Sequence, residues 1–220
     1  MINIAGKKLF RIKALVDIEE YGVKKGDLGG WIENEKNLIQ SGAAWVTDYA
    51  EVFGDAKIFG SAQVSGDACV SGSAKVYGDA KVYGSAKVSG NAWVYGDAKV
   101  HGDAKVYGNA QVYGSAKVSG SAEVSGSAEV SGSAKVYGDA CVSGDADYAV
   151  IKGFGTVYRP TTFFRCRDGE ARVTCGCFYG TIDEFREQVK RTREGKVANE
   201  YLKIADLMEY HFKEDGGING

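Results

Sequence analysis

Two histidines are the side chains of this sequence best suited to proton transfer, because imidazole changes its charge close to neutral pH. His101 follows Val100 in a strictly periodic stretch, on a surface that we expect to be smooth and without a loop beside it. His211 stands near the end of an amphipathic helical pattern, where a packed structural role is the simpler interpretation. His101 is therefore the single candidate for acid–base chemistry.

Three cysteines near the C-terminal end, Cys166, Cys175 and Cys177, carry sulfur donors that zinc prefers, and His211 could add a nitrogen. Their spacing lacks the paired Cys-x-x-Cys units of structural zinc sites. The alternative is that Cys166 and Cys175 are small hydrophobic residues of a core. We favour the second interpretation and expect no metal.

Other chemical motifs are missing from the sequence. It holds no phosphate-binding Walker loop, no dinucleotide-binding fingerprint and no nucleophile elbow, and we expect no cofactor. The net charge is −2 and is spread evenly, so nucleic acid is not an expected partner. There is no membrane-length apolar run, no signal-peptide pattern, and the five cysteines are irregularly spaced. These features predict a cytoplasmic protein without membrane contact.

A six-residue repeat dominates the chain. From Gly54 to Gly144 glycine returns at every sixth position, in units that read Gly-[Asp/Ser/Asn]-Ala-x-Val-[Tyr/Ser]. This period is typical of a β-helix, with glycine at the corners and a short strand along each Ala-x-Val stretch. Alternation along the strand directs alanine and valine inward, and directs the x position and the tyrosine or serine that follows valine outward.

The repeat resembles the hexapeptide repeat of left-handed β-helix proteins, in which an aliphatic residue recurs every six positions and a small residue follows four places later, as at Val82 and Ala86. The resemblance implies a left-handed parallel β-helix of about six triangular coils, with three hexads in each coil. Acyltransferases of that family use a histidine as general base, which implies this role for His101. The stretch Gly26-Asp27-Leu28-Gly29-Gly30-Trp31 is also similar to the start of bacterial YdcK-like proteins, which are β-helical and described as transferases without an established reaction.

In the coil that the resemblance implies, outward residues of successive coils stack into columns. One face carries a column of aromatic rings beside a tryptophan and a lysine. Its members are Phe59, Tyr77, Tyr95 and Tyr113, with Trp93 and Lys75 beside them. An exposed aromatic strip is typical of an interface, and the alternative is that the rings only support one another along the sheet.

A second face carries a column of lysines next to Tyr83, His101 and Tyr137. These lysines are Lys81, Lys99, Lys117 and Lys135. The column could bind an anion or an acidic partner, or it could be a solvated face balanced by the corner aspartates, which we favour. The third face is mixed. It carries Glu51, Cys69, Lys87, Lys105, Glu123 and Cys141.

Two non-repetitive segments flank the solenoid of residues 42–146. Residues 1–41 alternate apolar and basic residues from Leu9 to Leu15, which predicts a strand of an N-terminal β cap. Residues 147–220 predict a small α+β domain that packs on the last coil.

We expect strands at Phe154–Arg159 and Thr161–Cys166 in this C-terminal domain, and a two-residue turn at Asp168-Gly169. That turn would set Phe164 opposite Val173 and Cys166 opposite Ala171. A capping box, Thr181 to Glu184, opens a helix that buries Ile182, Phe185 and Val189. A second helix is expected to place Tyr201, Ile204, Leu207, Met208 and His211 on one stripe.

The sequence favours a non-enzymatic binding or scaffold protein that presents flat faces to a protein partner or to itself, as a dimer or trimer. The alternative is an acyltransferase that uses His101 in a cleft between protomers. A further alternative is an inhibitor of a host enzyme, encoded by a phage or mobile element, because near-identical repeats suit recently expanded genes.

Overall fold

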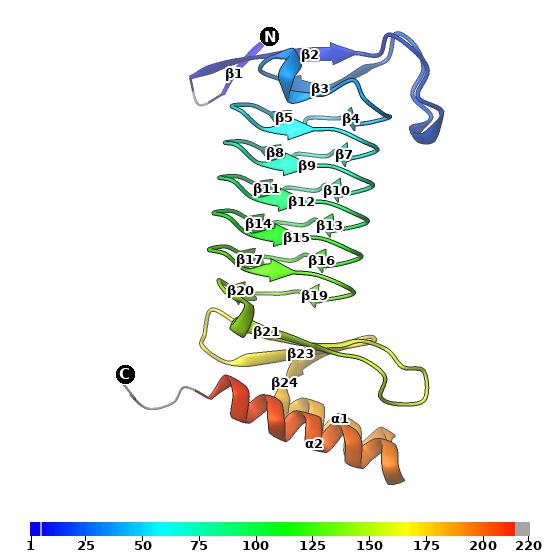
Figure 1. Ribbon diagram of the computed structural model, residues 1–220, viewed down its shortest axis with the longest axis vertical. Helices are drawn as coiled ribbons and strands as arrows, with labels where there is room; N and C mark the ends of the chain where they lie inside the picture. The colour runs from blue at the N-terminus through cyan, green and yellow to red at the C-terminus, as the bar shows by residue number, and fades with distance from the viewer. Residues whose placement is uncertain (5, 214–220) are drawn as a thin grey trace.

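The computed structural model describes residues 1–4 and 6–213, which form a column of stacked coils between two end units (Figure 1). The expected mainly β fold with a parallel solenoid of about six coils is confirmed. The solenoid strands are each two residues long. In chain order they are β4 (Trp45–Val46), β5 (Glu51–Val52), β6 (Lys57–Ile58), β7 (Gln63–Val64), β8 (Cys69–Val70), β9 (Lys75–Val76), β10 (Lys81–Val82), β11 (Lys87–Val88), β12 (Trp93–Val94), β13 (Lys99–Val100), β14 (Lys105–Val106), β15 (Gln111–Val112), β16 (Lys117–Val118), β17 (Glu123–Val124), β18 (Glu129–Val130), β19 (Lys135–Val136) and β20 (Cys141–Val142).

Each coil has three faces, because every strand pairs in parallel with the third strand along the chain. The β10–β13 pair sets Lys81 beside Lys99, eighteen residues later. The aromatic face is the sheet β6-β9-β12-β15-β18, and the lysine face is the sheet β4-β7-β10-β13-β16-β19. The mixed face is β5-β8-β11-β14-β17-β20, which β1 to β3 extend at one end. The columns expected from an eighteen-residue coil are thus present.

The solenoid interior consists of the alanine and valine of each unit. Both are fully buried in every regular unit, as at Ala98 and Val100. Between coils, the backbone N–H of Lys81 donates to the carbonyl of Ala98 at 2.9 Å, and that of Tyr83 donates to Val100 at 3.0 Å. Small side chains fill this narrow interior without overpacking it.

The glycine corners of successive coils touch one another. Gly96 has a φ of 68°, and a Cβ placed on it would lie 3.1 Å from the backbone nitrogen of Gly114. An L-residue is therefore disfavoured there both by its backbone conformation and by the space available. Asp48, which occupies a glycine position in an imperfect early unit, adopts a φ of 57°, a conformation that aspartate tolerates better than most residues.

The N-terminal unit continues the mixed face. Its strands are β1 (Ile2–Ile4), β2 (Lys7–Lys13) and β3 (Leu28–Ile32), and β3 pairs in parallel with β5. Short 3-10 turns lie between β2 and β3 at Glu19–Tyr21 and after β3 at Glu35–Asn37. The buried Asn37 amide donates to the carbonyls of Gly54 and Ala56 at 3.0 and 2.9 Å, so it satisfies part of the first coil's edge. The strand expected to reach Leu15 ends at Lys13.

The C-terminal unit is a four-stranded antiparallel sheet that lies between the last coils and two helices (Figure 1). Its strands are β21 (Tyr148–Ile151), β22 (Thr161–Arg165), β23 (Ala171–Cys175) and β24 (Phe178–Thr181). Phe164 packs with the solenoid core, whereas its neighbour Phe163 packs with the helices. Both faces of this sheet are therefore covered.

Side chains of residues that follow the last solenoid strand satisfy backbone groups at the last edge of every face, where a further coil would otherwise pair. Unpaired edges invite pairing with other chains, so each such bond blunts an edge. On the aromatic face, the backbone N–H of Glu129 donates to Asp145 Oδ1 at 2.9 Å. On the lysine face, the N–H of Lys135 donates to Thr162 Oγ1 at 3.1 Å, and on the mixed face the N–H of Ser143 donates to Asp147 Oδ2 at 2.8 Å.

Two expectations for this unit are wrong. Residues Phe154–Arg159 form no strand, because they lie in a loop with left-handed conformations at Gly153, Gly155 and Tyr158. The hairpin also pairs one residue out of the expected register, with Phe163 opposite Val173. The cause is that the loop has three residues rather than two, and within it the N–H of Gly169 donates to the Cys166 carbonyl. Because side chains alternate along a strand, a shift of one residue changes which residues of the two strands share a face of the sheet.

The helices are α1 (Ile182–Thr192) and α2 (Gly195–Phe212). The predicted capping box between Thr181 and Glu184 is present, and α1 buries the three expected residues. In α2 the expected stripe is wrong at two positions, because Leu207 is 58% exposed and His211 is also exposed, while Phe212 is buried instead. The helix is rotated so that small Ala198 and Ala205 face α1 and the sheet.

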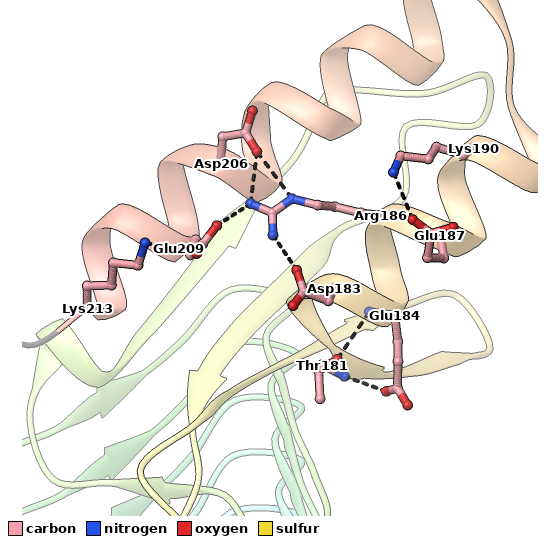
Figure 2. Close-up of polar contacts among 9 residues, drawn as sticks. All are labelled: Thr181, Asp183, Glu184, Arg186, Glu187, Lys190, Asp206, Glu209 and Lys213. Carbon is pink, nitrogen blue, oxygen red and sulfur yellow. Dashed lines mark hydrogen bonds and ion pairs between the residues drawn. The ribbon is translucent and has the colours of Figure 1, made fainter.

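A charged cluster joins the two helices (Figure 2). The Arg186 guanidinium of α1 contacts Asp183 at 2.7 Å, and Asp206 of α2 at 2.8 Å, and it also pairs with Glu209. The carboxylates are largely exposed, so solvent screens the attraction and the cluster mainly fixes the relative position of the helices.

We predict that Gly96→Ala lowers the free energy of unfolding by more than Gly132→Ala does. Both glycines have a positive φ, which costs about 1–2 kcal/mol for an alanine. Only Gly96 faces the next corner, since a Cβ on Gly132 would meet nothing within 4 Å. Urea denaturation followed by circular dichroism measures both losses, and equal losses would show that the close approach of the corners is not limiting.

Candidate functional site

The aromatic face carries a continuous stack of rings. Ring centroids are 4.7 Å apart for Phe59 and Tyr77, 4.9 Å for Tyr77 and Tyr95, and 5.0 Å for Tyr95 and Tyr113, with planes within 6° of parallel. Beside this stack, Trp93 is 37% exposed and lies 4.4 Å from the Lys75 ammonium, measured to the ring centroid. The six residues expected on this face are thus brought together.

Stacking leaves these rings half-buried rather than fully exposed. The hydroxyls of Tyr95 and Tyr113 contact Gln111 and Glu129 of the neighbouring column at 3.3 and 3.2 Å. Burial raises the pKa of the Tyr95 hydroxyl, so the phenol stays neutral. The face is consequently flat and amphipathic over the four coils that carry Phe59, Tyr77, Tyr95 and Tyr113.

The lysine face aligns its four lysines through strand pairing, from Lys81 to Lys135. Within residues 1–4 and 6–213, none of the four ammonium groups lies within ion-pair distance of a carboxylate. The mixed face differs, because Lys105 and Arg167 there both contact Glu123, each at 2.9 Å. The lysine face therefore carries positive charge that no carboxylate of the described residues neutralises directly.

His101 lies on this positively charged face, close to Lys99 and Lys117. Its ring stacks on Tyr83 with a centroid distance of 4.7 Å. Burial lowers the pKa of His101 below its ordinary value, and the charges of Lys117 and Lys99 lower it further. The imidazole is consequently neutral at neutral pH, which is the state that a general base requires.

The lysine face is not as smooth as the sequence suggests, because the C-terminal sheet forms one wall of a cavity beside His101. This cavity measures about 400 Å³. Its lining residues are His101, Lys117, Ser119, Lys135, Tyr137, Thr174, Gly176, Cys177, Phe178 and Tyr179. Lys81 and Lys99 do not line it, so only the last part of the lysine column belongs to this site.

Cys177, Phe178 and Tyr179 of the cavity wall were not expected at the site from the sequence. Cys177 lies in the tight turn between β23 and β24, in which Gly176 has a φ of 65°, and Phe178 and Tyr179 are the first two residues of β24. The Cys-Gly-Cys-Phe-Tyr stretch is a recognisable turn signal, but its contact with the lysine face depends on how the sheet packs. Tyr179 stacks edge-on against Tyr137 with centroids 5.1 Å apart, which closes one side of the cavity.

The three C-terminal cysteines are placed apart by the corrected register. Cys166 is buried against the solenoid core, Cys175 packs on the helix side of the sheet, and Cys177 is exposed. Burial raises the pKa of the Cys166 thiol to about 11, so it remains a protonated small hydrophobe. In the described part of the chain, His, Cys, Asp and Glu side chains nowhere gather in threes around a common point that could hold a metal ion.

We predict that Lys117→Gln raises the pKa of His101, because it removes a positive charge that disfavours the imidazolium. Lys99→Gln should act in the same direction. An NMR titration of the histidine Cε1 protons measures the change, and His211→Gln assigns the two signals. Lys87→Gln, on the mixed face, is the control. No rise in the first two variants, or an equal rise in the control, would contradict the placement of these charges.

Comparison with known proteins agrees with the geometry of the coils. The YdcK beta solenoid repeat model matches residues 62–78, which span β7, β8 and β9 and therefore one strand of each face. No curated protein matches the chain. Among the described residues, neither helix combines the length and apolar character needed to cross a bilayer. The matched coil and the parallel coils stacked on it identify the chain as a β-solenoid repeat protein that resembles YdcK.

Proposed function

We propose that the protein is a non-enzymatic binding protein whose aromatic face contacts a protein partner or a second copy of the chain. The observation that carries this proposal is the unbroken ring stack from Phe59 to Tyr113 beside the half-exposed Trp93. Tyrosine and tryptophan are enriched at the centres of interfaces. Because these rings are already ordered by stacking, binding would cost little further side-chain entropy.

Self-association is the first form of this function that we propose. A dimer would place two aromatic faces against each other around a two-fold axis, whereas a trimer would set the aromatic face against a different face of the next copy. The location that we propose is the cytoplasm, on the basis of the odd number and irregular spacing of the cysteines.

The double variant Trp93→Ala with Tyr95→Ala should weaken association by about tenfold or more, because it removes two central rings of the proposed contact. Sedimentation velocity over a range of concentrations measures the change, and thermal unfolding verifies the fold. The matched control is Tyr107→Ala on the mixed face, which removes a ring that is likewise 37% exposed. If association is unchanged by the double variant, or is weakened equally by the control, the aromatic face is not the interface.

Acyl transfer is a second candidate function, and the cavity beside His101 favours it. A neutral imidazole lies there with two lysines that form no ion pair within the described residues, and the C-terminal sheet of the same chain forms one wall of the space. In this proposal His101 would accept the proton of an amine or hydroxyl acceptor as that group attacks the carbonyl of an acyl thioester. The C–S bond of the thioester would then break, and the departing thiolate would take up the proton from His101. The lysines would bind the anionic part of the donor.

For this second candidate we expect turnover of acetyl-CoA or succinyl-CoA with some member of a panel of amines and alcohols. His101→Gln should lower that turnover by about 10²–10⁴-fold, the range typical of a lost general base. Release of free CoA thiol measures the rate. Absence of turnover with every acceptor, or turnover that His101→Gln leaves unchanged, would remove acyl transfer as a function.

A further inference from the structure

One column of the lysine face has a gap in its stack of rings. The residues that follow the inward valines there are Tyr83, His101, Ser119 and Tyr137. Successive rings of the uninterrupted columns lie 4.7–5.0 Å apart. The positions of His101 and Tyr137 are two coils apart, which is about 9.6 Å, and a small serine stands between them. This spacing equals twice the distance between successive rings of an uninterrupted column.

The gap at Ser119 opens into the cavity described above. Ser119 lines this cavity of about 400 Å³ and is only 7% exposed, so it forms part of the floor. His101 and Tyr137 lie on either side of it, and the β23–β24 turn with Tyr179 covers the end nearest the C-terminal sheet. A volume of this size accommodates a small organic molecule rather than a single ion.

The charge at the rim of the gap is positive. Lys117 and Lys135 lie side by side on the paired strands β16 and β19, and both line the cavity. No acidic residue is among the residues that line it. Two ammonium groups on neighbouring strands repel each other, and an anion held between them would relieve this repulsion.

We propose that this cavity binds a planar aromatic anion. Its ring would occupy the gap at Ser119 between His101 and Tyr137, and its carboxylate or phosphate would contact the ammonium groups of Lys117 and Lys135. The ring of the ligand thereby completes the column in the way that a tyrosine does elsewhere. This proposal goes beyond the proposed partner binding, because it uses a different face and requires neither association nor turnover.

Four probes separate the two parts of the recognition. Adenosine 5′-monophosphate and 2-naphthoate carry a planar ring with a phosphate and a carboxylate, respectively, whereas adenosine lacks the anion and inorganic phosphate lacks the ring. Isothermal titration calorimetry of the full chain should show that at least one of the two aromatic anions binds about tenfold more tightly than adenosine and phosphate.

The decisive variant is Ser119→Tyr, which fills the gap with the residue that the same column carries at Tyr83 and Tyr137. It should weaken binding by about tenfold or more, while Ser119→Ala retains binding because the gap stays open. Ser65→Tyr is the matched control, because it makes the same change in the same column outside the cavity.

Charge recognition is tested by Lys117→Gln and Lys135→Gln, each of which should weaken binding of the aromatic anion several-fold. Lys81 belongs to the same lysine column but lies outside the cavity, so Lys81→Gln should leave the affinity for the aromatic anion unchanged. The proposal is overturned if neither aromatic anion binds at millimolar concentration, if adenosine or phosphate binds equally well, or if Ser65→Tyr weakens binding as much as Ser119→Tyr. Thermal unfolding of each variant confirms that the fold is retained.

Discussion

Contact between the glycine corners of successive coils is the constraint on which the rest of this structure depends. Because the corner backbones approach one another as closely as Gly96 and Gly114 do, the coils stack at the spacing of a β-sheet on all three faces at once. The alanine and valine interior is narrow because each side of a coil is a strand of only two residues. Every outward side chain then lies directly beside the residue eighteen positions away, so the chemistry of each surface is set by columns rather than by single residues.

The columns differ in whether their neighbours attract or repel. Aromatic rings gain contact area from identical neighbours, and the stack from Phe59 to Tyr113 is flat and half-buried as a result. Lysines do not gain in this way, and the positive column keeps its charge without carboxylate partners within the described residues. On the mixed face, repulsion between lysines of successive coils is reduced by ion pairs such as that of Lys105 with Glu123. The same lattice thus produces one surface suited to apolar contact and another suited to anions.

The solenoid could be predicted from the sequence because its geometry is local and repetitive. The period places Ala98 and Val100 inside and aligns Tyr77 with Tyr95 without any further information. The C-terminal unit could be predicted only in part, since the capping box at Thr181 is a local signal. The hairpin register depended on whether Asp168-Gly169 formed a two- or three-residue loop, and the cavity beside His101 depended on how a distant turn packs. The hairpin register and the cavity are both set by tertiary contacts, which produce no periodic pattern in the sequence.

The capped edges at the two ends have a consequence for how this protein can change in length. Asn37 at one end and Asp145, Thr162 and Asp147 at the other bond to the backbone of the coil next to them. Because each coil offers equivalent backbone groups, these bonds do not depend on the number of coils between the two ends. Duplication or loss of eighteen residues would move the ends apart or together by one sheet spacing and keep every column in line. A change of six residues would instead turn one end by a third of a revolution and join unlike columns. Whole-coil steps are therefore the natural unit in which such a gene can grow or shrink.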